Sequence, residues 1–228
     1  MRIGGTQSHG REATIAACLD PLETALAVFG LTLGYGRVAP QMDDRDLRTL
    51  VTRLGHEELL PMLRGPGDPA RCLDEVLTTW LPDRARPDAL APIAADTSVK
   101  LSPRFGTVLR AYAAAHDPRL ATLRLIPLVL AAWVRYLMGR NDAGARIPVA
   151  PDPQRGVLRQ RLAGLSLGGD NRAVAQAVPG WLSPIVGADL AAAGLADVLV
   201  ADVLALAGGP GYIRARLHAV AVGEDNVP

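Results

Sequence analysis

The chain has 228 residues, of which 49% are hydrophobic, and a formal net charge of +1 at pH 7. This length allows one sizeable hydrophobic core, or at most two small ones. The basic residues are spread along the chain without clusters or interleaved aromatic residues, which argues against a nucleic acid as partner.

The two cysteines, Cys18 and Cys72, lie in apolar segments and form no metal-binding pattern, so the sequence predicts neither disulfides nor a metal site. Residues 1–11 are polar and glycine-rich and lack the apolar stretch of a secretory signal. The apolar run over residues 125–134 is too short to span a bilayer. We therefore predict a soluble, cytoplasmic protein without membrane contact.

The first half of the chain predicts helices separated by glycine and proline. Residues 22–35 are almost continuously apolar and predict a buried helix that starts at Asp20-Pro21. Apolar residues at three- and four-residue spacing predict shorter helices over residues 46–54, 57–63 and 70–80. After a proline-rich connector, Ser102-Pro103 predicts the start of a helix that runs to about residue 115.

The second half is also predicted to be helical. Residues 120–138 form the most apolar predicted helix, and a surface loop over residues 141–153 follows it. Five further helices are predicted over residues 155–165, 173–178, 186–193, 195–207 and 212–220. No alternating strand pattern of useful length occurs, and the glycines at 208–211 follow a helix instead of a strand, unlike a dinucleotide-binding turn. The sequence thus predicts an all-α fold.

Lys100 is the only lysine among 24 basic residues. A lone ammonium among so many guanidinium groups either has a specific task or has survived by chance on a solvated face. Asp20 and Glu23 bracket Pro21 in the pattern of a helix capping box.

Several segments then point to a family. They are, in chain order, CLDPLETALAVFG at 18–30, LGY at 33–35, DTSVK at 96–100, RFG at 104–106, IPL at 126–128, Trp133, RYL at 135–137, DP at 152–153, AGL at 193–195, GPG at 209–211 and Arg214. Together they resemble the C-terminal domain of the mannitol dehydrogenase family, especially its fructuronate and tagaturonate reductase-like branch.

The resemblance implies a multi-helix domain over residues 12–222, between a flexible N-terminus (1–11) and a flexible tail (223–228). In full-length members such a domain packs on a preceding Rossmann domain and closes over a polyol, ketose or sugar acid. Because the chain begins with its own Met shortly before the resemblance, we expect no Rossmann domain, and therefore no NAD or other bound cofactor.

Family members also carry a catalytic Lys, an Asn five residues later and a His three residues further on. Here these positions hold Ile15, Asp20 and Glu23, and no lysine precedes Lys100. We therefore expect that the hydride-transfer apparatus has been lost. The two carboxylates are either the capping box already described or a general acid and base pair at the family's catalytic positions.

Lys100 and Arg104 stand where the resemblance places basic residues that contact substrate hydroxyl or carboxylate groups. An ammonium and a planar guanidinium would hold a carboxylate or phosphate. The alternative is a pair of solvated charges that interact with Asp96 or another neighbour.

Three functions follow. The favoured one is an enzyme repurposed for non-redox acid/base chemistry, such as isomerisation, dehydration or cyclisation, on a small, polar, oxygen-rich substrate, with Asp20 and Glu23 as catalytic residues. The second is a subunit of a split NAD-dependent polyol or sugar-acid oxidoreductase, and the third is a non-catalytic binding or scaffold protein. A second copy of the chain or a separate protein would cover the face that packs on a Rossmann domain in the family.

Overall fold

The computed structural model describes residues 4–65 and 68–224, with side chains from residue 10 onward in those ranges. The all-α prediction is confirmed. In the described ranges the regular elements are helices, and the only β pairing consists of two isolated bridges, Arg37 with Ala89 and Arg140 with Arg146.

The α-helices are α1 (Gly4–Leu33), α2 (Arg45–Arg53), α3 (Pro69–Glu75), α4 (Leu90–Ala94), α5 (Thr97–Leu101), α6 (Thr107–Ala114), α7 (Leu125–Leu137), α8 (Arg155–Arg161), α9 (Arg172–Val186), α10 (Ala196–Leu206) and α11 (Tyr212–Ala221). Tighter 3-10 turns are η1 (Ala39–Asp43), η3 (Leu60–Met62) and η6 (Pro118–Thr122). Wider π-helical turns are η2 (Leu54–Leu59), η4 (Val76–Trp80) and η5 (Ser102–Gly106).

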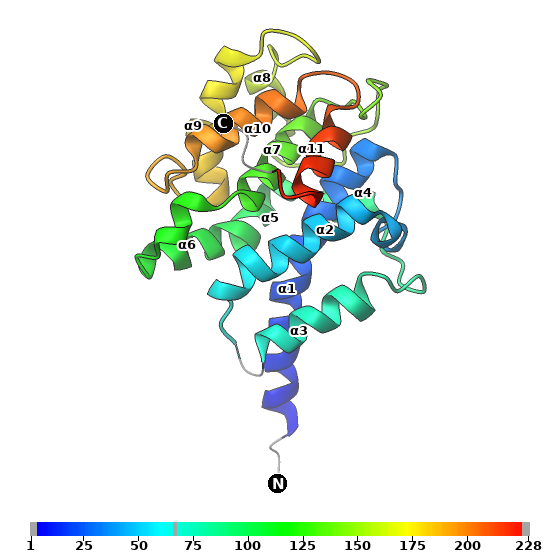
Figure 1. Cartoon of the computed structure of the whole chain (residues 1–228), viewed down its shortest axis with the longest axis vertical. Helices are drawn as coiled ribbons and strands as arrows, with labels where there is room; N and C mark the ends of the chain where they lie inside the picture. The colour runs from blue at the N-terminus through cyan, green and yellow to red at the C-terminus, as the bar shows by residue number, and fades with distance from the viewer. Residues whose placement is uncertain (1–3, 66–67, 225–228) are drawn as a thin grey trace.

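Helix α1 runs through the molecule, and its N-terminal end projects below the other helices, with α3 beside it (Figure 1). The segment from Leu22 to Phe29 is almost completely buried, and α1 packs against α2, α4, α7 and α11 as well as α3. The predicted helix start at Asp20 is wrong, because α1 already begins at Gly4 and continues through Pro21. Proline removes only the N–H that would bond the carbonyl of Ala17, and Ala17 is exposed, so water can hydrate that carbonyl.

The early start of α1 also makes residues 4–11 helical, although the sequence predicted them as part of a flexible terminus. Residues 1–3 of that segment and residues 225–228 of the predicted tail lie outside the described residues.

By length and composition, Gly10–Leu33 is the one described helical stretch that could cross a membrane, with a mean hydropathy of 1.4. However, 72% of its apolar window is buried inside the fold, as in the core helix of a soluble protein. The stretch is therefore weak support for a membrane span, and the absence of membrane contact stays a prediction.

Helix α7 lies at the centre of the fold, and all of its residues from Leu125 to Tyr136 are buried. It begins five residues later than predicted, after the 3-10 turn η6, and α10 packs along it. In the next part of the chain, the predicted helix over residues 186–193 is wrong. Helix α9 instead continues through Pro179 and Pro184 to Val186 and ends at Gly187, whose φ of 71° is the left-handed conformation that terminates helices.

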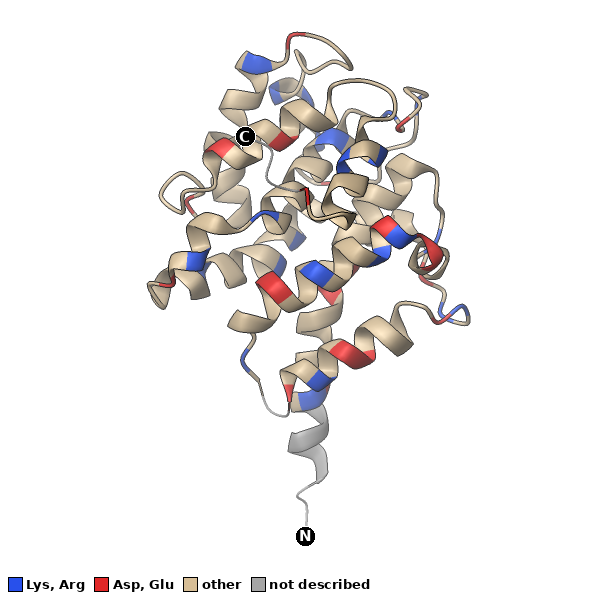
Figure 2. Ribbon diagram, in the orientation of Figure 1, with Lys and Arg blue, Asp and Glu red and all other residues tan. Residues whose placement is uncertain are grey.

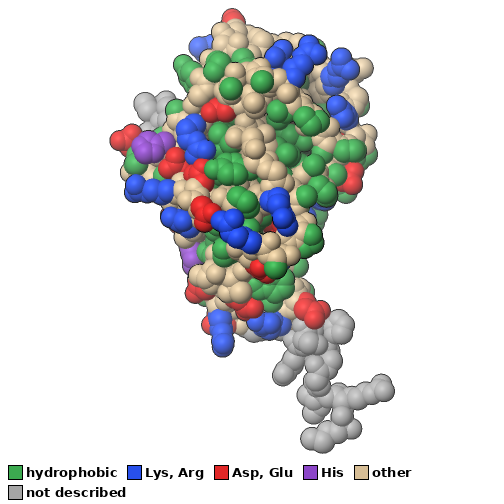
Figure 3. All heavy atoms as spheres, turned by 90° about the vertical axis from the view of Figure 1, so that its right-hand side faces the viewer, with side chains coloured by type: hydrophobic (Ala, Val, Ile, Leu, Met, Phe, Trp, Pro, Cys, Tyr) green, Lys and Arg blue, Asp and Glu red, His purple; other side chains and the backbone are tan. Residues whose placement is uncertain are grey.

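Figure 2 shows that the positions of acidic and of basic residues are both spread along the helices and loops. The face shown in Figure 3 likewise mixes charged, apolar and other groups over most of its area. This pattern is that of an ordinary solvated surface.

Candidate functional site

The four residues predicted for the site come from two neighbouring parts of the fold. Asp20 and Glu23 lie on α1, while Lys100 and Arg104 lie on the continuous helical segment formed by α5 and η5. This segment starts at Thr97, before the predicted start at Ser102-Pro103. Since α1 packs against η5, residues 80 positions apart in the sequence become neighbours.

Arg104 joins the two segments. Its Nη1 donates to the Thr24 hydroxyl at 2.6 Å, and its Nη2 lies 3.5 Å from a carboxylate oxygen of Asp20. The Arg104 side chain is only 12% exposed, whereas Asp20 is 47% exposed. The guanidinium is therefore fixed on the surface of α1, with Asp20 at its solvent side.

The capping-box interpretation of Asp20 and Glu23 is wrong. Both residues lie in the interior of α1, where the backbone N–H groups already have helical partners, so there is no helix end to cap. Their carboxylates instead bind arginines: Asp20 pairs with Arg104, and Glu23 pairs with Arg86.

Glu23 is the most perturbed acid of the cluster. Its carboxylate lies 3.3 Å from Arg86 Nη2, and Arg86 also binds Asp88 at 2.8 Å and stacks over the Trp80 ring at 4.9 Å. The Glu23 side chain is 13% exposed. Burial, followed by repulsion from Asp88, raises the pKa of Glu23 from 4.5 to about 7, although Arg86 opposes the shift.

Lys100 is half-buried beside this cluster. Its Nζ donates to the backbone carbonyls of Ile93 at 3.1 Å and Pro92 at 3.5 Å. Burial, followed by repulsion from Arg104, lowers the pKa of Lys100, while nearby carboxylates oppose that effect. Within the described residues Lys100 forms no ion pair, so the predicted alternative of a salt bridge to Asp96 is not observed.

Sequence reasoning missed Thr24, Arg86 and Asp88. Arg86 and Asp88 belong to the proline-rich connector, 63 and 65 positions after Glu23, and no local spacing links them to α1. It also missed Asp152, which accepts hydrogen bonds from the backbone N–H of Ser98 at 2.8 Å and from the Ser98 hydroxyl at 2.6 Å. Asp152 thereby holds the start of α5, and thus Lys100, in place.

The arrangement suits proton transfer. A carboxyl group with a pKa near 7 is populated in both protonation states at neutral pH and can act as acid or base. The adjacent cations can neutralise a negative ligand. No group of three or more His, Cys, Asp or Glu side chains in the described part of the chain is placed to bind a metal ion.

The chain was compared with known proteins in sequence and in fold. No family model matches the chain. The chain is 35% identical to the D-mannonate oxidoreductase of Thermotoga maritima. The alignment is 228 positions long and covers 96% of this chain and 41% of that protein. The fold is similar to mannitol 2-dehydrogenase of Pseudomonas fluorescens, solved with NAD and D-mannitol, with a TM-score of 0.71 and 19% identity over 96% of this chain and 41% of that one.

A D-sorbitol dehydrogenase solved in substrate-free form is similar over 88% of this chain and 40% of that one, with a TM-score of 0.65 and 20% identity. The chain is similar to the C-terminal helical portion of these oxidoreductases, in agreement with the resemblance to the mannitol dehydrogenase family that the order of the sequence segments indicated. It spans about two fifths of the length of these relatives.

Proposed function

We propose that this domain binds a hydroxy acid of the sugar-acid class beside Glu23 and Lys100, and that Glu23 exchanges a proton with the bound molecule. The observation that carries the proposal is the Glu23 carboxyl group, which is 13% exposed, lies among arginines and has a pKa of about 7. Such a group combines the protonation equilibrium of a general acid or base with a partly desolvated position.

The substrate class is argued from the cations and from the relatives. Lys100 uses two of its three N–H bonds on backbone carbonyls, which leaves one for a substrate oxygen. Arg104 is fixed by Thr24 and Asp20 and adds positive charge beside it. The relative from Thermotoga maritima is named for D-mannonate, a polyhydroxy acid, and such a carboxylate would complement this charge.

Acid/base chemistry is favoured over hydride transfer by the residues at the family's catalytic positions. Ile15, which replaces the lysine base, is 5% exposed and packs in the hydrophobic core, so that position carries no titratable group. The two other positions hold carboxylates, and one of them has the shifted pKa. We therefore place the proton-transfer role on Glu23 and a positioning role, through Arg104, on Asp20.

Isotope exchange tests this proposal whatever the product is, because it follows only the transferred proton. The chain is incubated in D₂O with D-mannonate, D-fructuronate and related acids, and proton NMR follows deuterium incorporation at carbons next to the carboxylate or ketone. We expect incorporation with at least one compound, and a loss of about 100-fold or more in Glu23→Gln, because glutamine cannot exchange the proton.

Glu12→Gln is the matched control, since Glu12 is an exposed glutamate on the same helix. Lys100→Met should weaken binding of the acid while the fold is retained. Equal exchange in Glu23→Gln and Glu12→Gln would exclude Glu23 as the proton-transfer group.

A second candidate is a subunit of a split oxidoreductase. The exposed side of α1 before Asp20 carries the small residues Ala13, Ala16 and Ala17. In α5, Val99 next to Lys100 is 59% exposed. A Rossmann-type chain could pack on these exposed residues. NAD-dependent oxidation of D-mannonate that appears only when such a chain is added would favour this function, and loss of binding in Ala17→Arg would place the interface on α1.

A further inference from the structure

We infer that a second site, a cavity of about 990 Å³ between the C-terminal end of α7, the loop that follows it and α8, binds an organic anion with an apolar body. This volume lies at the upper end of the range of small-molecule sites in proteins. None of the residues that line the cavity belongs to the Asp20, Glu23, Lys100 and Arg104 cluster, so the inference is independent of the proposed function.

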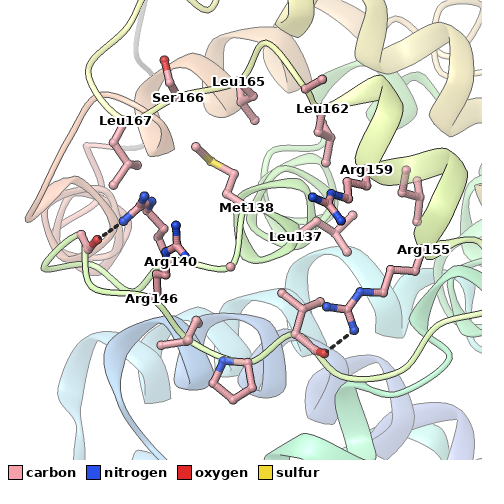
Figure 4. Close-up of a pocket in the computed structure, with 17 residues that line it drawn as sticks. Leu137, Met138, Arg140, Arg146, Arg155, Arg159, Leu162, Leu165, Ser166 and Leu167 are labelled. Carbon is pink, nitrogen blue, oxygen red and sulfur yellow. Dashed lines mark hydrogen bonds between the residues drawn. The ribbon is translucent and has the colours of Figure 1, made fainter.

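The charge of the cavity is entirely positive. Its charged lining residues are Arg140, Arg146, Arg155 and Arg159, and the lining contains no Asp or Glu. Figure 4 shows Arg140 and Arg146 on one side of the cavity and Arg155 and Arg159 on the other. Like charges gathered in this way repel one another unless an anion lies between them.

None of these arginines forms an ion pair with a carboxylate in the described part of the chain. Arg140 donates to the carbonyl of Gly144 at 3.0 Å and Arg155 to that of Val149 at 3.1 Å, which orients their guanidinium groups. The side chains of Arg146 and Arg159 form no hydrogen bond with other described residues. The cavity therefore retains many donors for a ligand.

Some arginines elsewhere in the described part of the fold do have acidic partners. Many arginines outside the cavity bind a carboxylate within 4 Å, namely Arg11, Arg53, Arg84, Arg86, Arg104, Arg119, Arg214 and Arg216. Four arginines around one cavity, all without a carboxylate in the described residues, form a concentrated positive field.

The rest of the lining is largely apolar. Met138 and Leu165 lie between the two arginine groups in Figure 4, and Leu137, Leu158 and Leu162 also line the cavity. A fully hydrated inorganic ion would leave this surface without a partner, whereas an aryl or alkyl group would cover it. The ligand chemistry that fits is therefore a carboxylate or phosphate group attached to an apolar body.

Binding of three naphthalene probes to the chain tests this inference, because the probes share one apolar body. They are 2-naphthyl phosphate, 2-naphthoate and the neutral 2-naphthol, each titrated calorimetrically at low salt. We expect one saturable site for at least one of the anions, and an affinity about tenfold or more lower for 2-naphthol, since a charge-assisted hydrogen bond is lost. The anion that binds more tightly identifies the preferred head group.

Substitutions locate the site. Arg146→Gln and Arg159→Gln should each weaken binding of the anionic probe by about tenfold, while the fold is retained because both side chains are exposed. Arg161→Gln is the matched control: Arg161 is an exposed arginine on the same helix α8 but does not line this cavity. Glu23→Gln should also leave probe binding unchanged.

Three results would overturn the inference. They are the absence of saturable binding by either anion, equal affinity for 2-naphthol, and a loss in Arg161→Gln as large as that in Arg159→Gln. The last result would show a general charge effect instead of a site.

Discussion

The carboxylate of Glu58 accepts the backbone N–H of Ile126 at 2.7 Å and thereby caps the N-terminus of α7. Its other oxygen accepts the N–H groups of Arg124 at 2.6 Å and Leu125 at 2.8 Å. Glu58 comes from the π turn η2 and is 5% exposed. A helix start in the middle of the core, where water cannot satisfy the backbone donors, thus depends on one distant side chain.

Glu58→Gln should lower the free energy of unfolding by about 1–3 kcal/mol, because the amide NH₂ cannot accept a hydrogen bond and leaves at least one buried N–H without a partner. Chemical denaturation measures this loss. Glu57→Gln is the control, since Glu57 is 51% exposed and pairs with Arg53 at the surface. It should change stability by less than about 0.5 kcal/mol, and similar losses in both variants would refute the capping role.

The raised pKa of Glu23 predicts a pH dependence of stability. Between pH 4.5 and about 7 the Glu23 carboxyl group is protonated in the folded protein but has released its proton in the unfolded chain. The free energy of unfolding should therefore fall as the pH rises through this window, by on the order of 3 kcal/mol from this group. Asp88 and Asp20 favour the bound proton, while Arg86 and Arg104 oppose it.

Glu23→Gln removes this ionisation. The stability of the variant relative to the natural chain should rise between pH 4.5 and 7 and level off above that range, as urea denaturation at several pH values would show. Parallel pH profiles for the two proteins would mean that Glu23 titrates near its ordinary pKa.

Gly106 should not tolerate a side chain. A Cβ at this position would overlap the backbone carbonyl of Val186 in α9, and backbone cannot move as a flexible side chain can. Gly106→Ala should therefore cost more than about 2 kcal/mol of stability.

Gly180 in α9 serves as the control. No atom lies within 4 Å of the position that a Cβ would occupy there, so Gly180→Ala should stabilise the helix by about 0.5–1 kcal/mol. Thermal unfolding distinguishes the two outcomes.

Thr24 should matter for the position of Arg104. Thr24→Val retains the shape of this 1% exposed side chain but removes the hydroxyl that accepts from the guanidinium, with an expected loss of about 1–2 kcal/mol. Thr24→Ser retains the hydroxyl and serves as control. If Thr24→Val unfolds at the same denaturant concentration as the natural chain, the Arg104 contact contributes nothing to stability.

The sequence predicted the helical class, because buried helices carry a strong apolar pattern. It also predicted the two segments that contain Asp20, Glu23, Lys100 and Arg104, because both belong to the segments that resemble the family. It did not predict where α1 begins. Asp20-Pro21 is a strong local start signal, but tertiary packing of residues on both sides of the proline outweighs one lost hydrogen bond.

Partners distant in sequence were also not predictable. The contacts of Glu23 with Arg86, and of Glu58 with the start of α7, depend on how helices pack, which no local spacing encodes. The arginines of the second cavity are spread over residues 140–159 in a loop and a helix, so the sequence shows no cluster there, and only the fold gathers them.

The contact between α1 and α11 has a consequence for synthesis on the ribosome. The buried side of α1 is made before the other described helices, yet part of its packing surface is supplied by residues 212–221 of α11, the last of the described helices. A nascent chain therefore lacks this part of the packing surface of α1 until residues 212–221 have been made, which follows the synthesis of α1 by on the order of 10 s or more at ordinary elongation rates. During that interval it is a natural client for chaperones that bind apolar segments.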